Sequence, residues 1–232
     1  MLNDTWYYWL DTAHSPSLNM ALDEALLKHA ARTERCIVRF YEWDRPTISI
    51  GYLQNYEAGK RQGFEIVRRP TGGGVVFHDN DLTYTVVLPA GHWLTTVDRE
   101  SSYGHINQAV TRGLQQCELQ AALTDATIPH SVERRTMVCF KNPTRYDIML
   151  GDRKVAGSAQ RRIREGILHQ GSIHFGGPLP LARAKLIDAI IEGFRHNLDV
   201  QVREFTPPAE LLQKAENIAA KKYATDTWNQ KR

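Results

Sequence analysis

Apolar residues recur along the chain at two spacings, one typical of strands and one of helices. Short runs rich in β-branched and aromatic residues, bounded by Gly, Pro, Asn and Asp, predict strands. These runs are Trp6–Leu10, Cys36–Tyr41, Thr47–Gly51, Glu65–Arg68, Gly74–Phe77, Leu82–Leu88, Tyr146–Leu150, Lys154–Ala156 and Ile167–Phe175. Apolar residues three or four positions apart predict amphipathic helices. These are expected from about Ser15, at Ser101–Leu119, at Pro180–Leu198 and at Ala209–Tyr223.

Several neighbouring strands are separated only by short turns, for example at Asp44-Arg45-Pro46 and Gly151-Asp152. Short turns join antiparallel strands, whereas parallel strands need long crossover connections. We therefore predict an α/β fold of the α+β kind, with a mixed, largely antiparallel sheet flanked by helices. No linker divides residues 1–232, so we expect a single domain. The polar, irregular segment Thr124–Met137 has a length at which loops are often functional or disordered.

Composition argues against several classes of protein. The net charge is +3 without a clustered basic run, which argues against nucleic-acid binding. No apolar stretch approaches the roughly 20 residues of a membrane span. Cys36, Cys117 and Cys139 form no close pair, which argues against disulfides and a zinc site; the first two are expected in the core. No signal peptide is visible, so we expect a cytoplasmic protein without a membrane or nucleic-acid partner.

The segment Arg68–Asp79, with the sequence Arg-Arg-Pro-Thr-Gly-Gly-Gly-Val-Val-Phe-His-Asp, has the residue types of a binding loop. Three consecutive glycines allow positive φ and let a ligand approach main-chain N–H groups, which can bind an anion. The two arginines add charge suited to phosphate or carboxylate. A tight turn with surface arginines is an equally open interpretation. The spacing matches neither a P-loop nor a dinucleotide-binding loop.

Two other residues could supply reactive groups. Lys154 leads into the small residues Gly157, Ser158 and Ala159, which leave room for a ligand beside the ammonium. Cys139 is followed closely by Lys141, and a cysteine with a cation nearby can act as a thiolate nucleophile. Each also has an unreactive interpretation, as a solvated lysine on an edge strand and as a buried core cysteine.

The charged pair Asp23 and Glu24 belongs to the first predicted helix. We expect both carboxylates on its solvated face.

Taken together, these segments resemble the lipoate–protein ligase A family and its octanoyltransferase relatives, whose fold is similar to that of biotin protein ligases. Arg68–Asp79 resembles the family signature Arg-Arg-x-x-Gly-Gly-Gly-x-Val-Phe-His-Asp. Lys154–Ala159 resembles its Lys-Val-x-Gly-x-Ala signature, and Ser17–Leu26 resembles its first helix. A biotin protein ligase fits less well, because its glycine-rich loop has a Gly-Arg-Gly pattern.

The resemblance implies that the glycine segment and the lysine frame one pocket for an acyl chain. It implies that Lys154 and Cys139 are catalytic, with Lys154 polarising the acyl carbonyl. It implies no metal site. The substrate-binding residues that it implies are Arg68, Arg69, Gly72, Gly73, Gly74, Val75, Phe77, His78, Gly157, Ser158, Ala159, His169 and Gly171.

Two activities remain open under this resemblance. A transferase would move octanoyl or lipoyl from acyl carrier protein through a Cys139 thioester to a lysine of a lipoyl-domain protein, such as glycine cleavage H protein or an E2 subunit. It needs no tightly bound cofactor. A ligase would form an acyl-adenylate from ATP and free lipoate or octanoate, with Mg²⁺.

Cys139–Thr144 resembles the Cys-Phe-x-x-Pro-Ser segment of one octanoyltransferase branch, with Thr144 in place of Ser. Gly177–Arg232 is also short for the accessory domain of many ligases. Both observations favour the transferase. A non-catalytic acyl-binding protein is the alternative of another class, and it would leave Lys154 idle.

Overall fold

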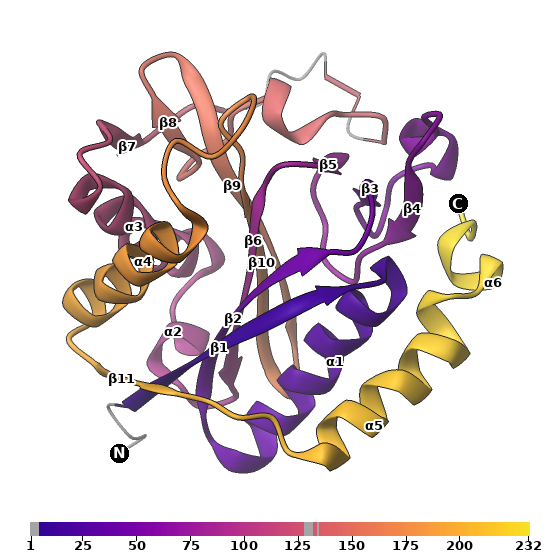
Figure 1. Cartoon of the computed structure of the whole chain (residues 1–232), viewed down its shortest axis with the longest axis horizontal. Helices are drawn as coiled ribbons and strands as arrows, with labels where there is room; N and C mark the ends of the chain where they lie inside the picture. The colour runs from indigo at the N-terminus through magenta and orange to yellow at the C-terminus, as the bar shows by residue number, and fades with distance from the viewer. Residues whose placement is uncertain (1–4, 128–131, 134) are drawn as a thin grey trace.

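The computed structural model describes residues 5–127, 132–133 and 135–232. An eight-stranded sheet runs through the middle of the molecule with helices on both faces (Figure 1). In sheet order, its strands are β11 (Gln201–Glu204), β1 (Thr5–His14), β2 (Cys36–Trp43), β6 (Leu82–Pro89), β10 (Gly166–Ile173), β9 (Arg153–Ile163), β8 (Ile148–Leu150) and β7 (Ala121–Leu123). Strand β1 is parallel to β2 and β11, and the other neighbours are antiparallel. The predicted mixed, largely antiparallel sheet is confirmed.

A separate three-stranded sheet carries the glycine-rich segment. It consists of β4 (Glu65–Arg68), β3 (Thr47–Ile50) and β5 (Val76–His78), in that order. Its own small core is formed by Ile48, Ile50 and Val75. The sequence predicted these strands but not that they form a second sheet.

Two pairs of helices cover the opposite faces of the main sheet (Figure 1). On one face α3 (Arg99–Gln116) packs against α4 (Arg183–Leu198), and on the other α1 (Pro16–Thr33) packs against α5 (Ala209–Ile218). The short helices are η1 (Tyr56–Gly59), α2 (Trp93–Thr96), η2 (Cys139–Lys141), η3 (Ala219–Tyr223) and α6 (Asp226–Asn229). Within the described ranges, no helix has the length and apolar character needed to cross a membrane.

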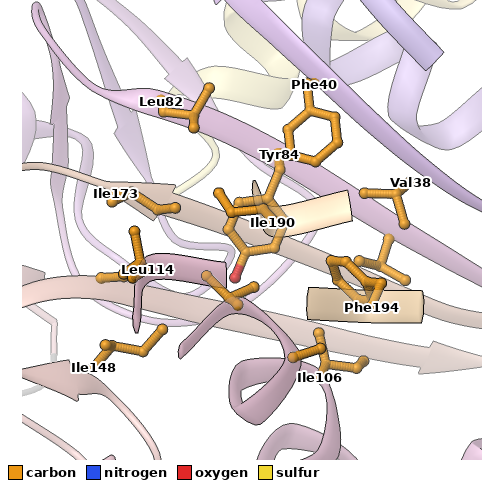
Figure 2. Packing of buried hydrophobic residues seen from close by; sticks show 14 of the residues in the cluster. Val38, Phe40, Leu82, Tyr84, Ile106, Leu114, Ile148, Ile173, Ile190 and Phe194 are labelled. Atoms are coloured by element: carbon orange, nitrogen blue, oxygen red, sulfur yellow. The ribbon is translucent and has the colours of Figure 1, made fainter. Parts of the chain in front are cut away.

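Alternating residues of β6 divide the interior into two cores. Leu82, Tyr84, Val86 and Leu88 face α3 and α4, in the core drawn in Figure 2. Val87 instead joins the core beneath α1. This is the alternation expected of a strand that is covered on both sides. The close approach of α3 and α4 depends on small residues, since a Cβ on Gly193 would lie 2.1 Å from the Ala109 carbonyl oxygen.

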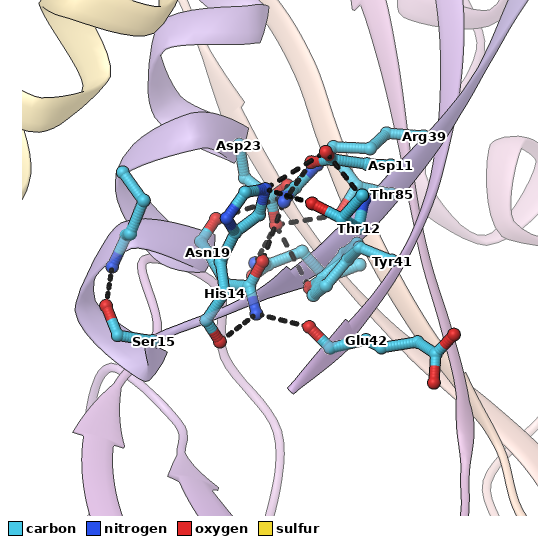
Figure 3. A network of polar contacts seen from close by, with 12 residues as sticks. Asp11, Thr12, His14, Ser15, Asn19, Asp23, Arg39, Tyr41, Glu42 and Thr85 are labelled. Atoms are coloured by element: carbon cyan, nitrogen blue, oxygen red, sulfur yellow. Dashed lines mark hydrogen bonds and ion pairs between the residues drawn. The ribbon is translucent and has the colours of Figure 1, made fainter. Parts of the chain in front are cut away.

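The helix α1 buries a charged network against the sheet, shown in Figure 3. The Asp23 carboxylate is fully buried and lies 2.7 Å from the Arg39 guanidinium. Thr85 and Gln170 each donate a hydrogen bond of 2.7 Å to the same carboxylate. The expectation that Asp23 is solvated is therefore wrong. A carboxylate can be buried at this helical position because a cation and neutral donors satisfy it.

Glu24 was also expected in solvent, and its side chain is only 20% exposed. It accepts from Lys28 at 2.7 Å, from Lys222 at 2.6 Å and from the Tyr223 hydroxyl at 2.8 Å. Burial opposes its charge, but the hydrogen bonds from Lys222 and Lys28 lower the pKa of Glu24 to about 2. Glu24 thus joins α1 to the last part of the chain.

Most predicted elements are present with shifted ends. The Ser15 hydroxyl caps α1 by accepting from the Leu18 N–H, as the expected helix start requires. The largest shift is in β9, which continues to Ile163 because residues 156–163 pair in register with β10. Of the segment Thr124–Met137, residues 128–131 and 134 lie outside the described residues. The sequence did not predict β7, β11, α2 or α6.

Candidate active site

Cys139 begins the short turn η2 and is held by the main chain next to the three-stranded sheet. Its N–H donates to the Val75 carbonyl at 2.9 Å, and the Val75 N–H donates to the Met137 carbonyl at 2.8 Å. A Cβ on Gly74 would lie 2.6 Å from the Met137 carbonyl oxygen and 2.9 Å from the Cys139 nitrogen. Gly74 is therefore needed to let the cysteine segment approach the glycine loop.

Lys154 reaches the same point from β9. Its Nζ lies 3.4 Å from Cys139 Sγ, donates to the Cys139 carbonyl at 3.0 Å and lies 2.6 Å from Asp147 Oδ2. The side chain is only 2% exposed, and β9 lies between β8 and β10. The interpretation of Lys154 as a solvated lysine on an edge strand is wrong. A Cβ on Gly157 would lie 2.8 Å from this Nζ, so Gly157 leaves space for the amine.

The protonation of Lys154 depends on its neighbours Cys139 and Asp147. Burial opposes the ammonium, but the neighbouring Cys139 and Asp147 together raise the pKa of Lys154 above its usual value. Asp147 is itself fixed by Thr144, whose N–H and hydroxyl donate to Oδ2 at 2.6 and 2.9 Å. An ammonium this close to a sulfur stabilises the thiolate form, which is the nucleophilic form of cysteine. Asp147 was not predicted, since one Asp before a short strand carries no distinguishing pattern in the sequence.

A narrow pocket opens beside Cys139 and encloses about 410 Å³, including its mouth. Most of the surface that lines it is apolar. Eight predicted site residues line it, namely Arg69, Gly73, His78, Cys139, Gly157, Ser158, Ala159 and Gly171. Eight more were not predicted, namely Met20, Tyr41, Trp43, Ser49, Val76, Thr83, Gln170 and Ser172. The latter come from several strands and α1, so the sequence offered no local pattern that groups them.

One wall of the pocket is fixed by a chain of polar contacts. The ring of His78 stacks on Trp43 with centroids 4.3 Å apart. His78 Nδ1 lies 2.8 Å from Asp81 Oδ2, and Nε2 lies 2.8 Å from Ser49 Oγ. Thr83 and Ser172 also donate to the Asp81 carboxylate, at 2.8 and 2.7 Å. These polar atoms satisfy one another, so the wall is suited to an apolar ligand.

The two arginines of the glycine segment do not present free charge. Arg68 is fully buried, and its guanidinium donates to the main-chain carbonyls of Gly51, Tyr52, Gln54 and Asn229. The expectation that Arg68 binds a phosphate or lines the substrate entrance therefore needs correction. Each of its donors is used to hold the protein's own loops.

Arg69 lines the pocket but is also engaged by the main chain. It donates to the carbonyls of Ser49 at 2.8 Å, Gly72 at 2.6 Å and Gly74 at 2.6 Å. Burial lowers the pKa of Arg69 to about 10, so it stays charged at neutral pH. Its main effect is to fix the glycine loop, where Gly73 adopts a φ of 84°.

Three other predicted substrate-binding residues face away from the pocket. The side chains of Val75 and Phe77 belong to the small core of the three-stranded sheet. His169 is fully buried next to Tyr84, and burial lowers its pKa to about 3, which keeps it neutral. Gly171 leaves room for Tyr84, because a Cβ there would lie 2.1 Å from the ring. Val75, Phe77 and His169 therefore support the walls from behind, whereas Gly171 lines the pocket itself.

A second, more open pocket adjoins the first and shares Gly73, Ser158 and Ala159 with it. It encloses about 1390 Å³ including its open side. Other parts of its lining are Leu53, Gln54, Gly72, Arg99, Glu100, Tyr103, Met137, Thr144, Arg145, Tyr146 and Gln160. A narrow, strongly apolar pocket and a wider, more polar one thus meet at Gly73, Ser158 and Ala159. In the parts of the chain that are described, no three His, Cys, Asp or Glu residues are placed to hold a metal ion.

Comparison with known proteins places this geometry in a family. The octanoyltransferase LipM of Bacillus subtilis is 31% identical to this chain, and that of Anoxybacillus flavithermus is 34% identical. Each alignment is 282 residues long and covers 100% of both chains. A structure of lipoate-protein ligase A bound with ATP superposes with a TM-score of 0.81 at 24% identity, over 97% of this chain and 98% of that one. A bi-partite lipoate protein ligase from Thermoplasma acidophilum gives 0.77 at 23% identity, over 97% and 96%. These two structures show the shared fold. The lipoyl protein ligase A/B catalytic domain matches residues 15–205, and the chain belongs to that family.

Proposed function

We propose that this protein is an acyltransferase of protein lipoylation that moves an octanoyl or lipoyl group onto a lysine of a lipoyl-domain protein through a thioester on Cys139. The observation that carries the proposal is the 3.4 Å contact between Lys154 Nζ and Cys139 Sγ beside a pocket with an apolar lining. The identity to octanoyltransferases over the whole chain supports the same activity.

In the first step, the Cys139 thiolate attacks the carbonyl carbon of the acyl thioester on the donor. The C–S bond to the donor breaks, and the donor thiolate leaves and takes a proton from water. The Lys154 ammonium stabilises the negative charge that develops on the carbonyl oxygen. The pocket next to Cys139 holds the acyl chain out of water.

In the second step, the neutral amine of the target lysine attacks the Cys139 thioester. An amide bond forms, the bond to Cys139 breaks, and the thiolate is restored beside Lys154. The amine proton passes to solvent. A covalent intermediate divides one difficult acyl transfer into two easier ones.

The donor in this proposal is octanoyl carried by acyl carrier protein, and no tightly bound cofactor is needed. The alternative is a ligase that activates octanoate or lipoate with ATP and Mg²⁺. Supporting the transferase, the guanidinium groups of Arg68 and Arg69 are occupied by main-chain carbonyls. The acceptors in the proposal are proteins such as glycine cleavage H protein or an E2 subunit. A cytoplasmic location suits the three free cysteines.

The test is to give the protein a lipoyl domain with either octanoyl carrier protein or octanoate, ATP and Mg²⁺, and to follow both proteins by intact mass. We expect modification from the carrier thioester, and an octanoyl adduct on the enzyme when the lipoyl domain is left out. Cys139→Ser should abolish the adduct and the transfer. Cys117→Ser, a half-buried cysteine at the end of α3, is the matched control. Transfer only with ATP would favour the ligase, and no modification from either donor would favour a non-catalytic acyl-binding protein.

A further inference from the structure

Three cations gather around two aromatic rings at the surface, and we call them the basic cluster: Arg161, Lys222 and Lys231. Lys231 Nζ lies 3.5 Å from the centroid of the Tyr52 ring and 3.6 Å from that of Trp228. Lys222 Nζ lies 4.1 Å from the Trp228 ring, and Arg161 Cζ lies 5.4 Å from the Tyr52 ring. All three cations are partly exposed. The rings hold these like charges together by cation–π contacts.

The positive charge of this cluster is largely unbalanced. Lys222 pairs with Glu24 at 2.6 Å, whereas within the described ranges neither Arg161 nor Lys231 has a carboxylate within 4.0 Å. Burial, together with repulsion from Arg68, Lys222, Arg232 and Arg161, lowers the pKa of Lys231 to about 8. Repulsion between these like charges is relieved when a negatively charged partner binds beside them. A surface of this kind therefore attracts acidic proteins.

The basic cluster borders the open pocket. Arg161 donates to the Pro70 carbonyl at 3.3 Å, and the Tyr52 N–H donates to the Thr71 carbonyl at 2.8 Å. Next to Tyr52, Leu53 is 58% exposed and lines the open pocket together with Gly72. Figure 1 shows α6 and the end of the chain beside β4, on the opposite side of the molecule from α4. A protein bound at the basic cluster would therefore face the mouth of the site.

The distance between the basic cluster and Lys154 indicates which kind of partner can bind there. Arg161 and Lys154 lie on the same strand, β9, seven residues apart, which is about 23 Å at roughly 3.3 Å per residue. A target lysine reaches only about 6 Å from its main chain, so its protein must sit close to Cys139. A phosphopantetheine arm spans on the order of 20 Å and can bridge the distance.

We propose that the basic cluster is the docking surface for the acidic carrier protein that delivers the acyl group. This proposal rests on the proposed function. The carrier binds through its acidic face at Arg161, Lys222 and Lys231, and its arm enters the open pocket past Leu53 and Gly72. The acceptor protein uses another surface, nearer to Cys139.

The test compares two donors, octanoyl carrier protein and octanoyl-pantetheine, which has the thioester but no protein. We expect Lys231→Glu and Arg161→Glu each to raise the KM for octanoyl carrier protein about tenfold and to weaken its dependence on salt. Both variants should use octanoyl-pantetheine at the wild-type rate. Lys185→Glu makes the same change of charge on an exposed lysine of α4 and should alter neither donor.

The two proposals fail in different ways. Equal losses with both donors would overturn the docking surface, because they would mean damage to the pocket. A raised KM for the lipoyl domain, with that for the carrier unchanged, would overturn it as well, in favour of the acceptor. If the wild-type protein uses neither donor, the proposed function itself is overturned.

Discussion

The ammonium of Lys154 lies 3.4 Å from the sulfur of Cys139, although the two residues are 15 positions apart in the chain. Gly74 leaves space for the cysteine segment, and Gly157 leaves space for the lysine amine. A glycine of the loop between β4 and β5 and a glycine of β9 therefore allow this contact.

Replacing Lys154 should affect both activity and stability. We expect Lys154→Ala to slow acyl transfer by about 10²–10³-fold, since the developing oxyanion and the thiolate both lose their cation. It should also lower the free energy of unfolding by about 3–5 kcal/mol, because the buried Asp147 carboxylate loses its partner. Single-turnover transfer and urea unfolding measure the two effects. Lys141→Ala, at an exposed lysine of the turn η2 that carries Cys139, should change neither the rate of transfer nor the stability. Normal turnover of Lys154→Ala would exclude a catalytic role.

Asp147→Asn should change the pH dependence of transfer. The pKa of Lys154 is raised by Cys139 and Asp147, so removing the carboxylate lowers it. Because the proposed reaction needs the Lys154 ammonium, the fall in rate on the alkaline side should move to lower pH in the variant. The measurement is the rate of transfer from octanoyl-pantetheine across neutral and alkaline pH. If the rate falls at the same alkaline pH in the variant and in the wild type, the fall reports the titration of a group other than Lys154.

Gly74→Ala should displace Cys139. Its Cβ would lie 2.6 Å from the Met137 carbonyl oxygen, closer than packed atoms allow. We expect loss of the enzyme adduct on Cys139 and a lower melting temperature, measured by intact mass and calorimetry. Gly177→Ala is the control, because a Cβ there would meet nothing within 4 Å. A fully active Gly74→Ala variant would contradict the close approach of these segments.

Glu24→Gln should reduce the sensitivity of the fold to acid. Glu24 has a pKa of about 2 in the folded protein, against the usual 4.5, so it stabilises the fold above about pH 4.5. That stabilisation is lost as the pH falls towards 2. The variant should be less stable than wild type at neutral pH, and the difference should shrink steadily in acid. Urea unfolding at several pH values measures this. Glu216→Gln makes the same change at an exposed position on α5 and is the matched control.

Local patterns predicted much of the fold. The Ser15 cap, the turn at Gly151-Asp152 and most strand positions follow from spacing and turn residues. The three-stranded sheet was not predicted as a separate sheet, because the pairing of strands depends on contacts between distant segments. The solvated interpretation of Asp23 failed for a similar reason. Its partners Arg39, Thr85 and Gln170 come from three different strands, and a helical pattern cannot show them.

Resemblance to a family grouped residues from distant segments that residue chemistry alone left separate. The resemblance implied catalytic roles for Lys154 and Cys139 without indicating their separation, which is 3.4 Å in the structure. Asp147, which fixes the lysine, was not predicted. Arg68 looked like an anion-binding residue because its charge is visible in the sequence. The carbonyls of Gly51, Gln54 and Asn229 that use its donors are not visible there. Main-chain acceptors become apparent only once the loops are placed.

The contact between Arg68 and Asn229 also bears on how the protein matures during synthesis. Arg68 Nη2 donates to the Asn229 carbonyl at 2.8 Å, and the Asn229 side chain accepts from the Arg68 N–H at 2.8 Å. Segments near the N-terminus emerge from the ribosome and begin to fold first. The Arg68 guanidinium holds the loop at Gly51 and Gln54 through Nη1, but its Nε and Nη2 gain their acceptor only from residue 229. In a nascent chain, the full set of contacts around the Arg68 guanidinium can therefore form only after residue 229 has left the ribosome.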